Sequence, residues 1–274
     1  MNSFALQTFN GITFAALLFL LASGFTLTFG LMRIVNMAHG AYYLLGGYVG
    51  LTVAKATGSF GWAVLAGGLA AALLGLVSDR VLIRRTGENH LAQVLITVGL
   101  AYVIGDVTIK VWGGDALKLP LPPALRGVVE LPGGMIYPLY RLLLVVIGVA
   151  VAVMLWLIYR RTQIGAAIRA GVDDKEMVGA VGIHVDRLFV GVSALASFLA
   201  GCSGVLGGAF LTVYPGAEWE ILVFALVVVI VGGWWLVHVQ APAWTMFALI
   251  SAAMLLYGVC TALFVHWTPW GRDA

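Results

Sequence analysis

The sequence predicts an all-α fold: a polytopic transmembrane helical bundle of about eight spans. Of its 274 residues, 62% are apolar and only 10% are charged, whereas a soluble domain has about 25% charged residues. The apolar residues fall in runs near the roughly 20 residues that cross a hydrocarbon core of about 30 Å. Because these runs lack the alternation of barrel strands, and backbone groups in lipid must bond within the segment, helices are expected.

The predicted spans form one transmembrane domain covering residues 1–274. They lie at about 5–31, 37–57, 60–82, 91–112, 139–159, 188–213, 219–237 and 241–265. Met1 to Asn10 contains neither a basic residue nor a small-residue cleavage site, so the first run is expected to remain as a helix. The 35 glycines are scattered within the runs, as is typical of membrane helices that pack closely.

Basic residues predict the orientation. They are concentrated in the connections 80–90 and 160–187, which share a side with Arg33 if eight spans are present. The positive-inside rule makes that side cytoplasmic and places both termini outside. The short connection with Glu218 and Glu220 has no Lys or Arg and falls on the outer side. A net charge of +3 is too small to indicate a nucleic-acid partner.

The longest cytoplasmic connection, residues 160–187, reads RRTQIGAAIRAGVDDKEMVGAVGIHVDR. Its apolar residues recur at helical spacing among charges, which predicts two short amphipathic helices. Asp173 or Asp174 is placed to cap the second helix and Gly182 to end it. Such helices suit a solvated loop in the lipid headgroup layer or a groove on a partner protein.

Within this connection, EMVGAVG (176–182) resembles a degenerate form of the EAA-x-x-x-G coupling loop of ABC-importer permeases. The following LASFLAGCSGVLGGAF (195–210) is similar to the Gly-rich helix that comes next in branched-chain amino-acid permeases of the LivH type. GFTLTFGLMRIVNMAHGAYYLLGGYVG (24–50) and TVGLAYVIGDVTIKVWGGD (97–115) resemble that family's first helix pair and its fourth span. The resemblance covers most of residues 11–233. Residues 234–274 are atypical, because WWLVHVQAPAWTMFALIS replaces the family's Gly-Ser turn and Gly/Ala-rich last helix.

The resemblance implies a permease subunit of an ATP-driven ABC importer, multi-pass in a bacterial inner membrane. The implied partners are ATP-binding cassette ATPase subunits, a second related permease and an extracytoplasmic substrate-binding protein. The implied substrate is a branched-chain or other apolar amino acid, with small amides or urea as alternatives within the wider family. The ATPase-coupling loop would comprise Gly165, Arg169, Asp174, Glu176, Gly182 and Ile183.

A second group of candidate residues has both a pathway and a structural interpretation. Asn36, His39 and Gly40 lie where the apolar pattern breaks, and polar groups at membrane depth are functional candidates. The alternative is that Asn36 caps the second span and His39 bonds to backbone. Gly201 and Gly204, with Gly207 and Gly208, present small residues on one helical face, which favours close packing and is compatible with bordering a path.

Other polar residues are assigned structural roles. Asp106 and Lys110 are spaced to pair on one helical face, lining a path or anchoring the helix at the interface. Glu218 and Glu220 lie at a solvated helix start or at an outer vestibule. Trp234 and Trp235 are expected as interface anchors. Cys202 and Cys260 are interpreted as packing residues rather than a disulfide.

Motifs of catalysis are absent from the sequence. There is no G-x-x-x-x-G-K-[ST] loop, metal-ligand spacing or nucleophile elbow, so an enzyme is disfavoured and no cofactor is expected. A self-contained secondary transporter remains the alternative, although it usually carries ionisable residues or broken helices at mid-membrane. A channel or scaffold is a further class, disfavoured as an ion channel because no acidic ring is present.

Overall fold

The computed structural model describes residues 2–31, 34–87, 89–131, 135–173, 178–179 and 184–239. Seven long helices correspond to the first seven predicted spans: α1 (Asn2–Thr26), α2 (His39–Thr57), α3 (Phe60–Val81), α4 (His90–Trp112), α5 (Leu139–Arg161), α8 (Val185–Phe210) and α9 (Ala217–Val239). The π-helical η1 (Leu27–Leu31) extends α1. The predicted eighth span lies outside the described residues, as do most of the atypical residues 234–274.

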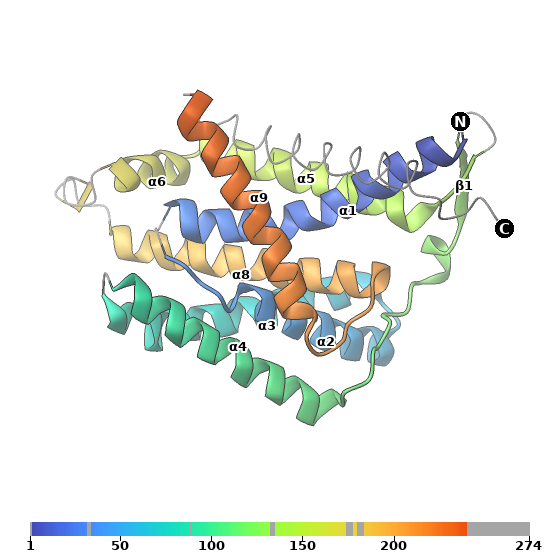
Figure 1. Cartoon of the computed structure of the whole chain (residues 1–274), viewed down its shortest axis with the longest axis horizontal. Helices are drawn as coiled ribbons and strands as arrows, with labels where there is room; N and C mark the ends of the chain where they lie inside the picture. Colours follow the sequence, from blue (N-terminus) through green and yellow to red (C-terminus); the bar gives the residue numbers. More distant parts are fainter. Residues whose placement is uncertain are drawn as a thin grey trace.

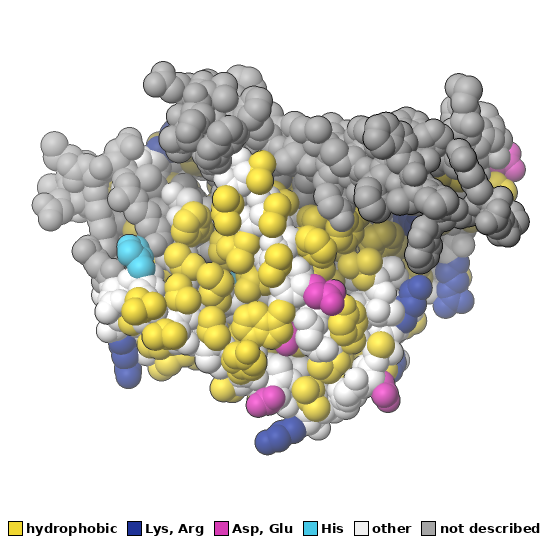
Figure 2. All heavy atoms as spheres, viewed as in Figure 1, with side chains coloured by type: hydrophobic (Ala, Val, Ile, Leu, Met, Phe, Trp, Pro, Cys, Tyr) yellow, Lys and Arg dark blue, Asp and Glu magenta, His cyan; other side chains and the backbone are white. Residues whose placement is uncertain are grey.

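The surface of the bundle is apolar, as a lipid environment requires. Within the described part, five segments are long and apolar enough to cross a membrane: Thr8–Gly30, Phe60–Thr86, His90–Trp112, Leu139–Arg161 and Arg187–Phe210. Leu73 on α3, Leu95 on α4, Val146 on α5 and Ile230 on α9 are all exposed. Figure 2 shows hydrophobic side chains spread over one face, with few charged side chains among them. The helical membrane bundle predicted from the sequence is confirmed.

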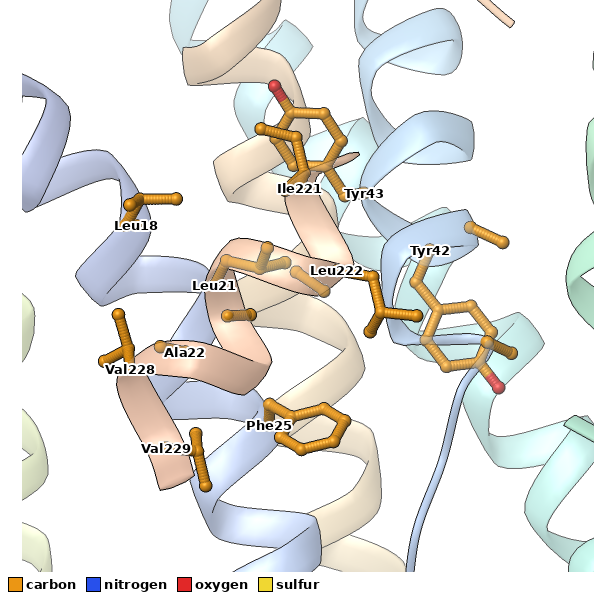
Figure 3. Close-up of a cluster of buried hydrophobic side chains, with 14 of the residues drawn as sticks. Leu18, Leu21, Ala22, Phe25, Tyr42, Tyr43, Ile221, Leu222, Val228 and Val229 are labelled. Atoms are coloured by element: carbon orange, nitrogen blue, oxygen red, sulfur yellow. The ribbon is translucent and has the colours of Figure 1, made fainter. Parts of the chain in front are cut away.

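The central helix of the bundle is α2, which packs against α3, α4, α8 and α9. Most of its residues are buried, and they include the large Tyr42, Tyr43 and Tyr48. A non-helical stretch, residues 34–36, leads to α2 (Figure 1). The first turn of α2 lies inside the bundle rather than at its surface, because residues 39–42 are all buried. Figure 3 shows side chains of α1, α2 and α9 meeting in one hydrophobic cluster around this turn.

Glycine allows α8 to approach α2 and α3 closely. A Cβ on Gly201 would overlap the Gly67 carbonyl of α3, and a Cβ on Gly204 would overlap the Tyr43 carbonyl of α2. Gly207 likewise leaves room for the Tyr43 ring. The packing interpretation of this glycine face is confirmed, and backbone contact replaces side-chain interdigitation at this crossing. Cys202, which is buried in the same helix with a free thiol, is a packing residue as predicted.

The connections lie at two ends of the bundle (Figure 1). One end holds η2 (Ile83–Thr86) and α6 (Gln163–Asp173), which belong to the two Arg-rich connections predicted to share a side. The other end holds a hairpin of β1 (Val128–Leu131) and β2 (Met135–Pro138), which the sequence analysis did not predict. The short helix η3 (Pro123–Leu125) precedes the hairpin. The structure therefore agrees with the predicted sides, and the end bearing α6 is the predicted cytoplasmic end.

Candidate functional site: a polar seam beside the central helix

The first turn of α2 is held by polar contacts to two other helices. The Asn36 side-chain oxygen accepts from the Ala38 backbone N–H at 3.0 Å. The Met37 N–H donates to the Thr97 hydroxyl of α4 at 3.1 Å. The His39 Nε2 lies 3.1 Å from the Leu21 carbonyl of α1. The predicted backbone bond of His39 is therefore confirmed. The Asn36 side chain bonds to the N–H of Ala38, the residue that precedes α2, and not to an N–H of the first turn of α2, so the predicted cap is not observed.

Two glycines bring neighbouring helices against this turn. A Cβ on Gly40 would overlap the Glu218 carbonyl in the first turn of α9. A Cβ on Gly24 of α1 would lie 3.1 Å from the His39 ring, which is tighter than ordinary contact. The first turns of α2 and α9 thus meet inside the bundle, and their aligned N–H dipoles make this region favourable for negative charge.

Three buried side-chain atoms in the described residues have no hydrogen-bond partner: the Tyr48 hydroxyl, His39 Nδ1 and Gln93 Oε1. Tyr48 and His39 are on α2, and Gln93 is on α4. Tyr48 stacks on Trp112 at the outer end of α4, whereas Gln93 lies in the first turn of α4, at the opposite end. Since buried polar atoms in proteins are nearly always satisfied, three such atoms mark a polar seam. We use this name for the boundary of α2 with α4 and, at His39, with α1.

The seam arises from an inside-out distribution of side chains on α4. Gln93, Thr97 and Thr108 are buried, while Leu95 and Val107 are among the exposed residues. In water the opposite distribution is normal, with apolar residues inside. A helix between lipid and a polar interior has this pattern, so the inner face of α4 belongs to the candidate site.

Glu218 and Glu220 differ in environment, which corrects the prediction of a solvated helix start for Glu218. Glu218 is only 6% exposed, and its Oε2 accepts from the Gly216 N–H at 2.8 Å. Glu220 is exposed and accepts from the Tyr214 hydroxyl at 2.7 Å, a bond that raises the pKa of Tyr214. The difference arises because the first turn of α9 places Glu218 between α2 and α4.

The predicted pairing of Asp106 with Lys110 is not observed. Both residues are described and exposed, and no ion pair joins them. An ion pair that the sequence analysis did not predict joins Arg84 of η2 to the buried Asp79 near the end of α3, at 3.1 Å.

Comparison with known proteins decides the class of this bundle. A family model described as "Branched-chain amino acid transport system / permease component" matches residues 7–273, nearly the whole chain. The chain belongs to this permease family.

Relatives of this permease come from both bacteria and archaea. LivH, a high-affinity branched-chain amino acid transport system permease protein of Escherichia coli K12, is 26% identical over 220 residues, covering 76% of this chain and 71% of LivH. BraD of Pseudomonas aeruginosa is 23% identical over 242 residues, covering 83% and 78% of the two chains. The probable LivH of Methanocaldococcus jannaschii is 24% identical over 272 residues, covering 95% and 84%. No solved structure matches the permease significantly.

The structure describes the first half of the predicted coupling loop of the permease, residues 160–173. Thr162 lies between α5 and α6, and its hydroxyl accepts from the Gly165 N–H at 3.1 Å, which caps the start of α6. A Cβ on Gly165 would overlap the Tyr159 carbonyl, so the sharp turn from α5 into α6 requires glycine. Arg169 donates to the same carbonyl. Gly165 and Arg169 are thereby brought together.

Four other predicted coupling residues, Asp174, Glu176, Gly182 and Ile183, lie outside the described residues. The same holds for Arg33 and for the side chains of Trp234 and Trp235. The described part of the loop, α6, packs against α5, α8 and η1. Through η1 it is continuous with α1, whose Leu21 contacts His39. This chain of packed helices joins the loop to the start of α2.

The sequence analysis missed Tyr48 and Gln93 as site residues. Gln93 is a polar side chain near the start of an apolar run, a signal that could have identified it. Tyr48 carries no such signal, because tyrosine is common in membrane helices and only the packing shows that its hydroxyl is left unpartnered.

Proposed function

We propose that the chain is the membrane-spanning permease subunit of an ATP-driven ABC importer of a bacterial inner membrane. It passes branched-chain or other apolar amino acids that an extracytoplasmic binding protein delivers. The family match over residues 7–273 carries this proposal, together with the names of the relatives LivH and BraD. The whole chain acts as one permease domain, and ATP is hydrolysed in separate ATPase subunits.

The polar seam is the part of the chain best suited to line the path. It offers hydrogen-bond donors and acceptors at three depths, on Tyr48, His39 and Gln93, within otherwise apolar walls. Weak, successive sites of this kind allow a solute to enter and also to leave. All three side chains are buried, so the seam is closed in this structure, and opening it requires α4 or α9 to move away from α2.

The coupling loop around 160–187 is the proposed contact for the ATPase, through Gly165, Arg169, Asp174, Glu176, Gly182 and Ile183. Movement of α6 would act on η1 and α8, which it contacts, and hence on the first turn of α2. A second related permease would complete the membrane assembly. Asn36, His39 and Gly40 would then lie where movement of the coupling loop reaches α2. Gly201 and Gly204 would hold the rigid contact of α8 with α3 and α2 beside them.

Uptake by the reconstituted complex tests this function. Proteoliposomes holding the permease, its partner permease and ATPases should accumulate radiolabelled L-leucine when ATP is on the side of the ATPases and the binding protein is on the opposite side. Leaving out the ATPase should reduce uptake to the level of empty vesicles. Leucine uptake that persists without the ATPase would indicate a self-contained transporter and contradict the proposal. Uptake of urea or a small amide in place of leucine would reject the substrate while keeping the class.

A further inference from the structure

The two ends of α4 are held in different ways, and the inner end is the firmly attached one. There the Gln93 amide donates to the Gly87 carbonyl at 2.9 Å, and the Thr97 hydroxyl accepts from the Met37 N–H at 3.1 Å. The Gln93 and Thr97 side chains are both buried, and a hydrogen bond in such surroundings is stronger than one in water. The inner end of α4 is therefore suited to act as a fixed point.

The outer end of α4 is attached to α2 mainly through Trp112. Within the described residues, the sole hydrogen bond from the outer half of α4 to another element joins the Trp112 indole N–H to the Thr52 hydroxyl, at 2.7 Å. The Trp112 ring also stacks on Tyr48, with centroids 5.2 Å apart. Because Thr52 is exposed, water can replace this bond at little net cost in free energy.

The connection that follows α4 leaves its outer end free to move. Residues 113–116 are all exposed, and Gly113 and Gly114 have no described atom within 4 Å of the position that a Cβ would take. The next fixed point is Leu117, which pairs with Val213 through two backbone hydrogen bonds of 2.8 Å. Since a few small exposed residues can absorb changes of φ and ψ, α4 can swing outwards while this pairing is kept.

Trp112 covers buried side chains of α2. Leu44, Tyr48 and Val213 form a buried cluster, and Trp112 packs against it. The Tyr48 hydroxyl in this cluster has no hydrogen-bond partner, and a buried polar group without a partner is destabilising. Water that enters when α4 moves away would satisfy this hydroxyl. The closed arrangement thus carries a penalty that opening removes, which brings the two arrangements closer in free energy.

We propose that Trp112 is the latch of an outer gate in the polar seam. Release of its indole from Thr52 lets α4 pivot about its inner end, so that the seam opens towards the outer side. This inference rests on the proposed function, for which it names the moving helix and the residue that holds it closed. Helix α9 is less suited to move, because its Glu218 carbonyl lies so close to Gly40 of α2 that a Cβ there would overlap it.

Labelling of a cysteine beneath Trp112 measures how often the gate opens. Leu44→Cys is introduced into the assembled complex, in a variant without Cys202 and Cys260, and a membrane-impermeant methanethiosulfonate is added on the outer side. Because Leu44 is fully buried, this cysteine reacts only when the seam opens, and its labelling rate reports the open population.

Two substitutions that remove the latch bond should raise the labelling rate of Leu44→Cys. Trp112→Phe keeps an aromatic ring beside Tyr48 but lacks the indole N–H, and Thr52→Val lacks the acceptor. Each should raise the rate about fivefold, as expected for the loss of one solvent-accessible hydrogen bond. Thr52→Ser keeps the hydroxyl and should leave the rate within about twofold of that with Thr52.

The matched control is Leu51→Cys on the same helix. Leu51 is equally buried, but it belongs to a different cluster, with Leu17 and Val205. It should stay unlabelled with every latch variant. Labelling of Leu51→Cys in parallel with Leu44→Cys would show a general loosening of the bundle and overturn the latch. Unchanged labelling of Leu44→Cys in Trp112→Phe and Thr52→Val would overturn it as well.

Distances between spin labels test the pivot. Lys55→Cys with Lys110→Cys marks the outer ends of α2 and α4, and Val81→Cys with Leu91→Cys marks the inner ends of α3 and α4; all four positions are exposed. On addition of leucine-loaded binding protein and ATP, the outer distance should gain a longer component while the inner distance stays unchanged. An unchanged outer distance, or equal lengthening at both ends, would overturn the pivot. Absence of leucine uptake by the wild-type complex would instead reject the proposed function.

Discussion

At the scale of single residues, the glycines of α8 determine how closely the central helices approach. Gly201 and Gly204 face backbone carbonyls of α3 and α2, so even one methyl group has no space there. Gly191, in the same helix, has no atom within 4 Å of the position that a Cβ would take, and it is exposed. The same substitution at these positions should therefore have opposite effects.

Gly204→Ala should destabilise the permease by about 1–3 kcal/mol, the usual cost of overpacking a close contact. Gly191→Ala should be neutral or stabilising by up to about 1 kcal/mol, because alanine has the higher helix propensity. Thermal unfolding of both variants in detergent measures the difference. Similar melting temperatures for the two variants would show that the helices separate more easily than their contacts indicate.

At the scale of elements, α4 is the helix whose two faces differ most in chemistry. Its lipid face carries Leu95 and Val107, while its inner face carries Thr97, which accepts from the Met37 N–H of the stretch before α2. Thr108 is equally buried, but its hydroxyl donates to the Gly105 carbonyl of its own helix. These threonines form a matched pair, one bonded between elements and one within α4.

Thr97→Val should destabilise the permease by about 1–3 kcal/mol, because it leaves the part-buried Met37 N–H without its acceptor. Thr108→Val should cost less than about 1 kcal/mol, because the bond that it removes lies within α4 and its loss leaves no backbone N–H without an acceptor. Chemical unfolding monitored by the tryptophan fluorescence of detergent-purified variants gives the comparison. If Thr108→Val proves as damaging as Thr97→Val, the bond across the seam does not anchor α2.

At the scale of the whole molecule, the Arg-rich connections lie at one end of the bundle and the β-hairpin at the other (Figure 1). This arrangement requires that α4 and α5 cross the bundle in opposite directions. Ala170 in α6 and Asp115 after α4 are exposed at the two ends. Their accessibility from each side of a cell membrane reports the orientation.

In cells expressing a variant without Cys202 and Cys260, Asp115→Cys should react with a membrane-impermeant maleimide added outside. Ala170→Cys should react only after the membrane is permeabilised, because the positive-inside rule places α6 in the cytoplasm. Leu95→Cys, which faces lipid, should remain unlabelled in both conditions. Labelling of Ala170→Cys in intact cells would reverse the orientation and remove α6 from the reach of an ATPase.

Local chemistry sufficed to predict much of the permease from its sequence. The first seven spans, the shared side of the Arg-rich connections, the close packing of Gly201 and Gly204, and the backbone bond of His39 all follow from runs of apolar residues, clustered charges or a polar group in an apolar segment. Each of these is a property of a short stretch, and lipid acts on each stretch separately. The same reasoning failed for the pairing of Asp106 with Lys110, because helical spacing permits an ion pair without requiring one.

Only the tertiary structure decided that Glu218 is buried, that Tyr48 has no partner, and that the first turn of α2 lies against α9. Glu218 and Glu220 are chemically alike and nearly adjacent in sequence, yet one faces Gly105 and the other faces Tyr214. Burial depends on which helices converge at a point, and here α2, α4 and α9 come together from distant parts of the chain. A single stretch of sequence contains no information about the neighbours that remove its water.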